Sequence, residues 1–242
     1  SAAGAEEGAK PVAQPMHVLI ICNAYASEKA LHVTNMQTLQ TITGDKPLPY
    51  KECRDLKMPL HEGDLLDFKA GGTSVGFFRA SGLPKSSSSL LLVPHRKDDT
   101  SGSLAFESHV FRELQNPQVA VVDAYRGEAG GRVRLADARE PTVPQSGEIA
   151  KSNHAVAMDL IRHLETLSFS SVMALNPGTY KVVLQGNEGS ILSMSDLQVQ
   201  GGSSKFIVLR MGSGSKSSKY PQELLVHTHG IENSAAQCAH SV

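Results

Sequence analysis

The sequence contains no tryptophan, and its 5 Tyr and 7 Phe make aromatic residues only 5% of the 242 residues. Charged residues are also scarce at 19%, and 23 basic against 24 acidic side chains leave a formal net charge of −1. This balance gives no field to attract duplex DNA or an acidic membrane surface, so we expect no nucleic-acid partner. No apolar run approaches the roughly 18 residues of a membrane-spanning helix, so we expect no membrane span. Hydrophobic residues still reach 40%, which is enough for a buried core.

Both ends of the chain differ in composition from its middle. Residues 1–15 are rich in Ala, Gly, Glu and Pro, which predicts a flexible arm. A start without methionine is compatible with a cut chain or with a mature end left after removal of a targeting peptide. Residues 213–242 are predicted to be a Gly/Ser linker and a C-terminal tail. Within that tail, the apolar patch at 224–226 is predicted to dock on the body or on a partner.

An internal repeat organises the middle of the chain. Ile21-Cys22-Asn23-Ala24-Tyr25 is similar to Val121-Val122-Asp123-Ala124-Tyr125, 100 residues later. Further on, residues 89–93 match residues 205–209 at a larger offset, because the second unit holds an insertion. The shared order of such matches predicts a duplication. It gives one domain at 16–114 and a second at 115–212.

Each repeat reads as short β-strands separated by turn residues. The expected strands of the first repeat are 18–25, 30–36, 64–69, 75–80 and 90–93, and those of the second are 119–125, 132–136, 179–185, 191–199 and 206–211. Residues 104–111 are an expected extra strand. This spacing predicts an all-β chain of two tandem β-sandwich domains of the immunoglobulin-like kind.

One helix is expected as an insertion in the second domain, near 152–167. Val156, Leu160, Leu164 and Leu167 recur at spacings of three and four, so they would share one helix face. This helix would cover a sheet edge or dock a partner.

A family resemblance rests on two short motifs. Asn23-Ala24-Tyr25 follows an apolar strand, and Leu175-Asn176-Pro177-Gly178-Thr179-Tyr180 precedes an alternating one. Both resemble marks of the small β-sandwich domains of the DUF4397 family, and the tandem arrangement resembles periplasmic alginate O-acetylation accessory proteins. The resemblance covers about residues 17–212 in two copies. It departs from the pattern at the predicted helix and at Leu60-His61-Glu62-Gly63, where the proline is missing. It implies a non-catalytic adaptor in an exported compartment.

Motifs for catalysis are weak. Residues 72–76 fit the nucleophile-elbow pattern around Ser74, but that motif needs a following helix and a strand is expected here instead. A hairpin turn is therefore predicted at 71–72. Residues 212–217 lack the spacing of a phosphate loop. We expect no catalytic residues, no cofactor and no enzyme activity.

The spacing of the histidines does not predict a metal site. His227 and His229 alternate near Cys238 and His240, and such ligands suit zinc or copper, but their place after a linker favours solvated histidines. The charged run that begins at His95 is predicted to be a solvated loop. We expect no bound metal.

The sequence allows two roles for each of two residue pairs, one of cysteines and one of tyrosines. Cys22 and Cys53 are expected either as small core residues or as a disulfide, which would need an oxidising compartment. Tyr25 and Tyr125 end equivalent strands and would either cap the sandwich ends or form a binding rim.

Taken together, these features predict a non-catalytic adaptor or structural subunit that acts through protein contacts in a periplasmic, lumenal or extracellular compartment. The first alternative is a module that binds carbohydrate or another small ligand. The second is a lumenal accessory subunit at the periphery of a large membrane complex, such as a photosynthetic assembly.

Overall fold

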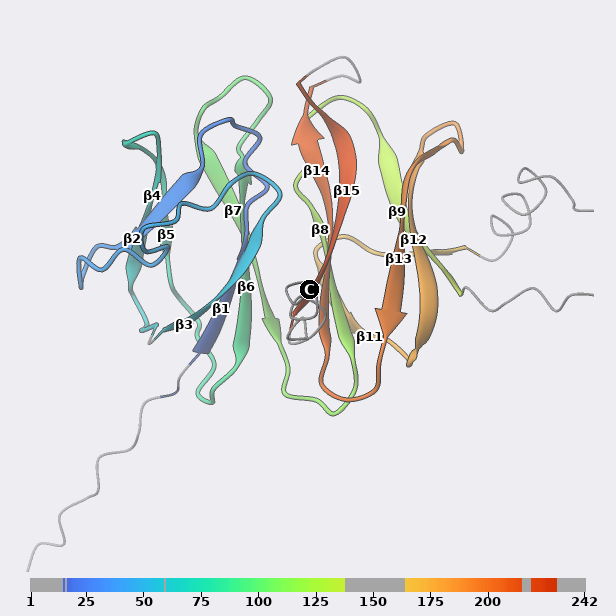
Figure 1. Cartoon of the computed structure of the whole chain (residues 1–242), viewed down its shortest axis with the longest axis horizontal. Helices are drawn as coiled ribbons and strands as arrows, with labels where there is room; N and C mark the ends of the chain where they lie inside the picture. Colours follow the sequence, from blue (N-terminus) through green and yellow to red (C-terminus); the bar gives the residue numbers. More distant parts are fainter. Residues whose placement is uncertain (1–14, 16, 59, 138–163, 215–218, 230–242) are drawn as a thin grey trace, which may run out of the picture.

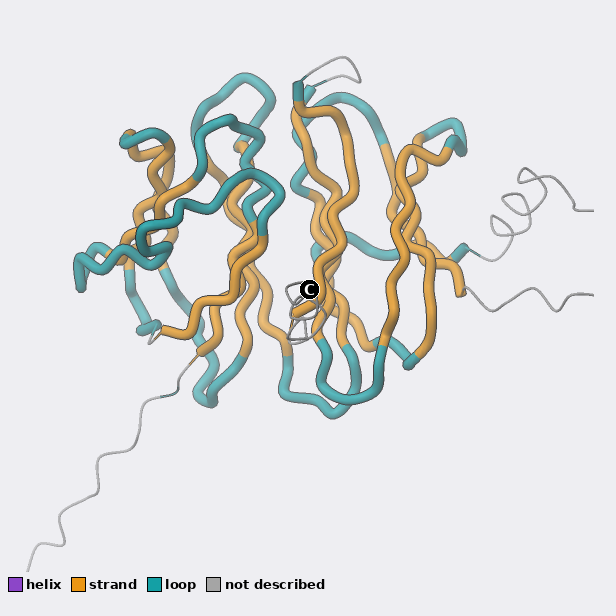
Figure 2. Tube along the Cα trace, in the orientation of Figure 1, coloured by secondary structure: helices purple, strands orange, loops and turns teal. Residues whose placement is uncertain are grey.

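The computed structural model describes residues 15, 17–58, 60–137, 164–214 and 219–229. All regular secondary structure in these residues is β-strand. The strands are drawn as arrows in Figure 1 and in orange in Figure 2. Across this part of the chain, no helical segment has the length and hydropathy that a membrane crossing requires. The predicted all-β fold is confirmed.

The first seven strands form two sheets packed face to face. The first outer sheet has the order β2–β4–β5, and the first inner sheet has the order β3–β1–β6–β7. Their bounds are β1 (His17–Cys22), β2 (Leu31–Asn35), β3 (Cys53–Met58), β4 (Leu65–Ala70), β5 (Thr73–Arg79), β6 (Ser89–Arg96) and β7 (Leu104–Phe111). Alternation along β2 and β4 turns Val33 and Phe68 inward against Leu19 and Leu92 of the inner sheet.

The remaining strands repeat this plan. The second inner sheet has the order β11–β8–β14–β15, and the second outer sheet has the order β10–β9–β12–β13. The bounds are β8 (Gln118–Asp123), β9 (Gly131–Asp137), β10 (Glu165–Thr166), β11 (Ser171–Ala174), β12 (Gly178–Gly186), β13 (Ile191–Val199), β14 (Lys205–Ser213) and β15 (Tyr220–His229).

Strand pairing supports the internal repeat. β1 pairs in parallel with β6, with Ile21 opposite Leu92, and β8 pairs in parallel with β14, with Val121 opposite Val208. These pairs match the two offsets read from the sequence. In each inner sheet, the N-terminal central strand also pairs antiparallel with a short strand, β3 or β11. The duplication is therefore visible in the topology as well as in the sequence.

The two inner sheets pack on each other, so the molecule is a stack of four layers (Figure 1). Ile20 and Leu91 of the first inner sheet share a buried cluster with Ile207 and Leu209 of the second. Both faces of the inner sheets are thus buried, which explains their continuous apolar runs. The contact between the halves is a hydrophobic core of its own.

The helix predicted near 152–167 is not supported. Residues 152–163 lie outside the described residues, and at its expected C-terminal end Glu165–Thr166 is β10, paired with β9. Leu164 and Leu167 are both buried, but in different clusters, Leu164 against Ala136 and Leu167 between the second two sheets. An odd spacing puts two residues on opposite faces of an extended segment, so both can be buried without a helix.

The predicted C-terminal tail also differs from the structure. Residues 220–229 form β15, which pairs antiparallel with β14 along its length. Leu224 and Val226 pack into the second sandwich, and Leu225 packs into the core between the halves. Of the two docking places expected for the patch at 224–226, the body is therefore the one used.

Candidate functional site: the open face of the first outer sheet

One sheet face stands out because nothing in the described residues covers it. Strand alternation turns alternate side chains of β2, β4 and β5 away from the core, and Met36 continues β2 with its backbone N–H bonded to Leu65. We call this surface the open face. Its outward side chains are His32, Thr34, Met36, Leu65, Asp67, Lys69, Ser74, Phe77 and Arg79.

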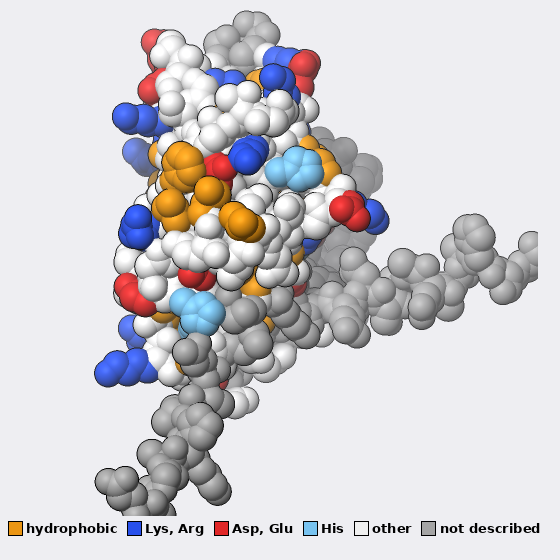
Figure 3. Space-filling model, turned by 90° about the vertical axis from the view of Figure 1, so that its left-hand side faces the viewer, with side chains coloured by type: hydrophobic (Ala, Val, Ile, Leu, Met, Phe, Trp, Pro, Cys, Tyr) orange, Lys and Arg blue, Asp and Glu red, His pale blue; other side chains and the backbone are white. Residues whose placement is uncertain are grey.

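Large apolar side chains are exposed on and beside the open face. Phe77 is 53% exposed and Met36 is 41% exposed, while Leu39, in the turn after β2, is 74% exposed. Figure 3, which views the molecule from this side, shows hydrophobic side chains gathered near the middle of the surface, with both cationic and acidic side chains beside them. A contiguous exposed apolar group of this kind is typical of a binding surface rather than of scattered exposure.

Asp67 of the open face is a buried carboxylate. Ser74 Oγ donates to Asp67 Oδ1 at 2.6 Å, and Lys69 Nζ lies 3.5 Å from Asp67 Oδ2. Ser74 therefore lies within β5, after the Gly71-Gly72 turn, with its hydroxyl bonded to an acid. The hairpin is confirmed, and the strained strand-to-helix turn of a nucleophile elbow is absent at this serine.

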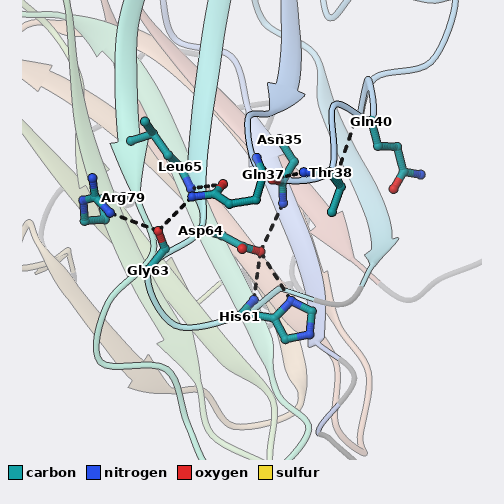
Figure 4. A network of polar contacts seen from close by, with 9 residues as sticks. All are labelled: Asn35, Gln37, Thr38, Gln40, His61, Gly63, Asp64, Leu65 and Arg79. Carbon is teal, nitrogen blue, oxygen red and sulfur yellow. Dashed lines mark hydrogen bonds and ion pairs between the residues drawn. The ribbon is translucent and has the colours of Figure 1, made fainter.

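A second network fixes the end of the sheet where Met36 and Arg79 lie (Figure 4). Asp64 Oδ2 accepts hydrogen bonds from Asn35 Nδ2 at 3.1 Å and from the His61 N–H at 3.0 Å. The Gly63 carbonyl accepts from Arg79 Nη1 at 3.1 Å, and Gln37 Oε1 accepts from the Leu65 N–H at 2.8 Å. These contacts tie the ends of β2, β4 and β5 together and hold the exposed side chains in place.

The cations of the open face are exposed, whereas its carboxylates are engaged. Lys69 is partly exposed, Arg79 is exposed, and exposed Lys29 packs over the β4–β5 turn at Gly71. Asp64 and Asp67 are buried and bonded. Nearby, hydrogen bonds from the Gly82 and Leu83 N–H groups hold the pKa of the Glu62 carboxyl below its ordinary value. The exposed charges on the open face itself are therefore mainly those of Arg79 and of Lys69, which is partly neutralised by Asp67.

The equivalent face of the second unit is covered over β9 and β12, whereas Met194 on β13 is 48% exposed. Leu164 packs on Ala136 and Val183 on the outside of β9 and β12. Arg134 Nη2 donates to the Leu164 carbonyl at 2.8 Å, and Arg134 Nη1 donates to Gln185 Oε1 at 3.0 Å. The two units share a topology but differ in how much of the outer surface is available.

Tyr25 and Tyr125 cap the sandwich ends instead of forming a rim. Both are buried, and their hydroxyls donate to the carbonyls of Gly102 and Gly214 at 2.7 and 2.5 Å. Of the two roles expected for this pair, capping is therefore the one that the structure supports.

Cys22 and Cys53 form a disulfide between the neighbouring strands β1 and β3, with a Cα–Cα distance of 4.0 Å. The remaining alternative for these cysteines, two separate core residues, does not hold.

The histidines differ most from their predicted places. His95 lies in β6 and is buried against the second unit, so the solvated loop expected for the charged run is wrong at His95. Further along the run, Lys97 and Asp99 do lie in an exposed loop after β6. His227 and His229 lie in β15, with His229 Nδ1 2.5 Å from Asp55 Oδ2, so they are not tail residues. Cys238 and His240 lie outside the described residues. Within the described ranges, no group of three or more His, Cys, Asp or Glu side chains could hold a metal ion.

Comparisons with known proteins do not identify a family for this chain. No family model matches the chain, and no curated protein matches it. The relation to the DUF4397 and alginate O-acetylation domains therefore stays a prediction. Among solved structures, the chain is similar to CBMbc, a family CBM26 module from Eubacterium rectale Amy13K in complex with maltoheptaose, with 12% identity and a TM-score of 0.24. The match covers 89% of this chain and 98% of that one. At this TM-score the likeness supports no conclusion about fold or ligand.

Proposed function

We propose that this protein is a non-catalytic adaptor whose first sandwich binds a protein partner through the open face. The observation that carries the proposal is the exposure of Phe77, Met36 and Leu39 on and beside one sheet face. Burying one such side chain on association contributes roughly 1.5–3 kcal/mol. Phe77, as an aromatic ring on a strand, is the expected anchor of the contact.

The charges favour a partner with acidic residues beside its apolar side chains. Arg79 is exposed on this face and Lys69, the ion-pair partner of buried Asp67, is partly exposed. Complementary charge around an apolar centre steers association and selects the partner. Carbohydrate binding, the first alternative from the sequence, would use the same face. Among the described residues, however, Phe77 is the sole exposed aromatic side chain that this face offers to a sugar.

The compartment is part of the proposal. We place the protein in an exported setting, periplasmic, lumenal or extracellular, and the Cys22–Cys53 disulfide supports this because disulfides persist under oxidising conditions. A role at the periphery of a large membrane complex is one form of the same proposal.

Site-specific photo-crosslinking tests the proposal. p-Benzoylphenylalanine replaces Phe77 in one variant, and replaces Met194, 48% exposed on the equivalent strand β13, in the matched control. We expect a protein adduct at position 77, absent at position 194, whose crosslinked segment is both acidic and apolar. Equal adducts at both positions, or none at position 77, would contradict it. So would a maltoheptaose titration that saturates with the native chain and fails with Phe77→Ala, because the face would then bind carbohydrate.

A further inference from the structure

His95 occupies the contact between the two sandwiches. It is the penultimate residue of β6 and is 3% exposed. Its Nδ1 lies 2.7 Å from the Arg96 carbonyl oxygen, and its Nε2 lies 3.3 Å from Nη2 of Arg126, which follows β8 in the second unit. One imidazole thus joins a strand of the first unit to a loop of the second.

These two contacts fix the protonation state of the ring. A guanidinium group donates only, so Nε2 of His95 must accept the hydrogen bond from Arg126. The Arg96 carbonyl accepts only, so Nδ1 must carry the proton. The neutral imidazole, with one donor and one acceptor, satisfies both contacts, whereas the doubly protonated ring would turn an N–H toward Arg126.

The groups around His95 shift its pKa in opposite directions. Burial and the nearby Arg126 charge lower the pKa of His95, while the Arg96 carbonyl and the carboxylates of Glu107 and Asp123 act against this, and the net direction is downward. Glu107, on β7, lies 2.7 Å from His109 Nε2. Asp123 Oδ2 accepts from Arg210 Nη1 at 2.7 Å. The nearby carboxylates are thus already paired.

Arg126 is held in position by the second unit. Its Nη1 donates to the carbonyls of Asp123 and Tyr125 at 3.0 and 2.8 Å, and its backbone N–H donates to Gly212 at 3.1 Å. The guanidinium therefore has little freedom to move away from a second positive charge. Protonation of His95 would therefore place two positive charges in contact at this point.

We propose that the His95–Arg126 contact is a proton-sensitive latch, closed when the imidazole is neutral and opened by acid at this end of the contact between the sandwiches. The direction follows from linkage. A buried neutral histidine binds fewer protons than its unfolded or exposed form, so the contact is fully stable above the ordinary histidine pKa of about 6.5 and weakens as the pH falls below it. This property is independent of the open face.

Amide hydrogen exchange tests the latch through residues beside it. The amides of Ala24 and Arg126 donate to the carbonyls of Pro94 and Gly212. We expect their protection factors in the native chain to fall severalfold between pH 7.5 and pH 5.0, because the contact requires the neutral form of His95. In His95→Gln, which keeps a neutral donor and acceptor, they should change less than twofold.

His227 gives the matched control. It is a partly buried histidine whose pKa, like that of His95, is lowered chiefly by burial, but it lies on β15 near Asp55, at a different place in the contact. His227→Gln should keep the full pH dependence at Ala24 and Arg126. Loss of protection in His95→Gln equal to that of the native chain, or none in the native chain, would overturn the latch.

A second variant keeps the test valid if His95→Gln does not fold. Arg126→Gln retains a donor to Nε2 but removes the positive charge. The NMR titration midpoint of the His95 ring should then move to higher pH than in the native chain. An unchanged midpoint would overturn the latch, because the Arg126 charge would have no effect on the ring.

Discussion

The guanidinium of Arg210 lies over the ring of Tyr125, with 4.7 Å between Cζ and the ring centroid. The first unit repeats this relationship with Arg96 over Tyr25, at 5.4 Å. The two arginines come from different positions of the equivalent strands β6 and β14. The capped tyrosine is thus a shared feature of both units that each copy completes with its own cation.

The two tyrosine hydroxyls should therefore stabilise the fold. Tyr25→Phe and Tyr125→Phe each remove one hydrogen bond to a carbonyl, and we expect each to lower the free energy of unfolding by about 0.5–1.5 kcal/mol. Urea denaturation measures this. The control is Tyr180→Phe, whose hydroxyl donates to the Asn176 carbonyl at an exposed position and should cost less. Equal losses in all three variants would contradict a special capping role.

The Cys22–Cys53 disulfide should contribute strongly to stability. It closes a loop across a sequence separation of 31, and in the chain-entropy description its removal lowers the free energy of unfolding by about 3–4 kcal/mol. We expect this loss in the Cys22→Ala, Cys53→Ala double variant. Thiol labelling in denaturant checks the bond itself, because one thiol per chain should react before reduction and three after it. Three reactive thiols before reduction would contradict the bond.

The two sandwiches should unfold as one unit because their inner sheets share a core. Leu209 is fully buried between the halves, and Leu209→Ala should cost about 2–5 kcal/mol. Leu184→Ala, inside the second sandwich, is the matched control and should cost a similar amount. Calorimetry should give a single transition for the native chain. Two separate transitions, with Leu209→Ala nearly neutral, would contradict a shared core.

Much of the fold could be predicted from local patterns. The apolar runs beginning at Val18 and Val119 and the alternating segments beside them are the strands of the sandwiches, because burial on one or two faces leaves a clear period. The repeat was visible since both copies keep the Ala-Tyr ending. In each, the residue before it, Asn23 or Asp123, accepts a hydrogen bond from the tyrosine N–H.

The strands that were missed have weaker patterns. β3 (Cys53–Met58) and β15 (Tyr220–His229) lie at sheet edges and mix charged, polar and apolar residues. β15 also follows a Gly/Ser stretch that predicts a linker. Their place is decided by pairing with strands distant in sequence, which local periodicity does not record.

The features on which the proposals rest, His95 and the open face, could not be predicted because they depend on contacts between units or layers. His95 stands in a charged run, and its burial comes from the second unit, which no local pattern reveals. The outward direction of Phe77 could have been predicted from strand alternation. The copies also differ because Leu164 covers part of the equivalent face, over β9 and β12, and strand alternation alone does not record this difference.

The most direct test is the affinity of the partner found by crosslinking. Isothermal titration compares the native chain, Phe77→Ala and Met194→Ala. Removing the aromatic anchor should weaken binding at least about tenfold, whereas Met194→Ala should stay within about twofold of the native Kd. A Kd for Phe77→Ala equal to that of the native chain would contradict a docking role for the open face.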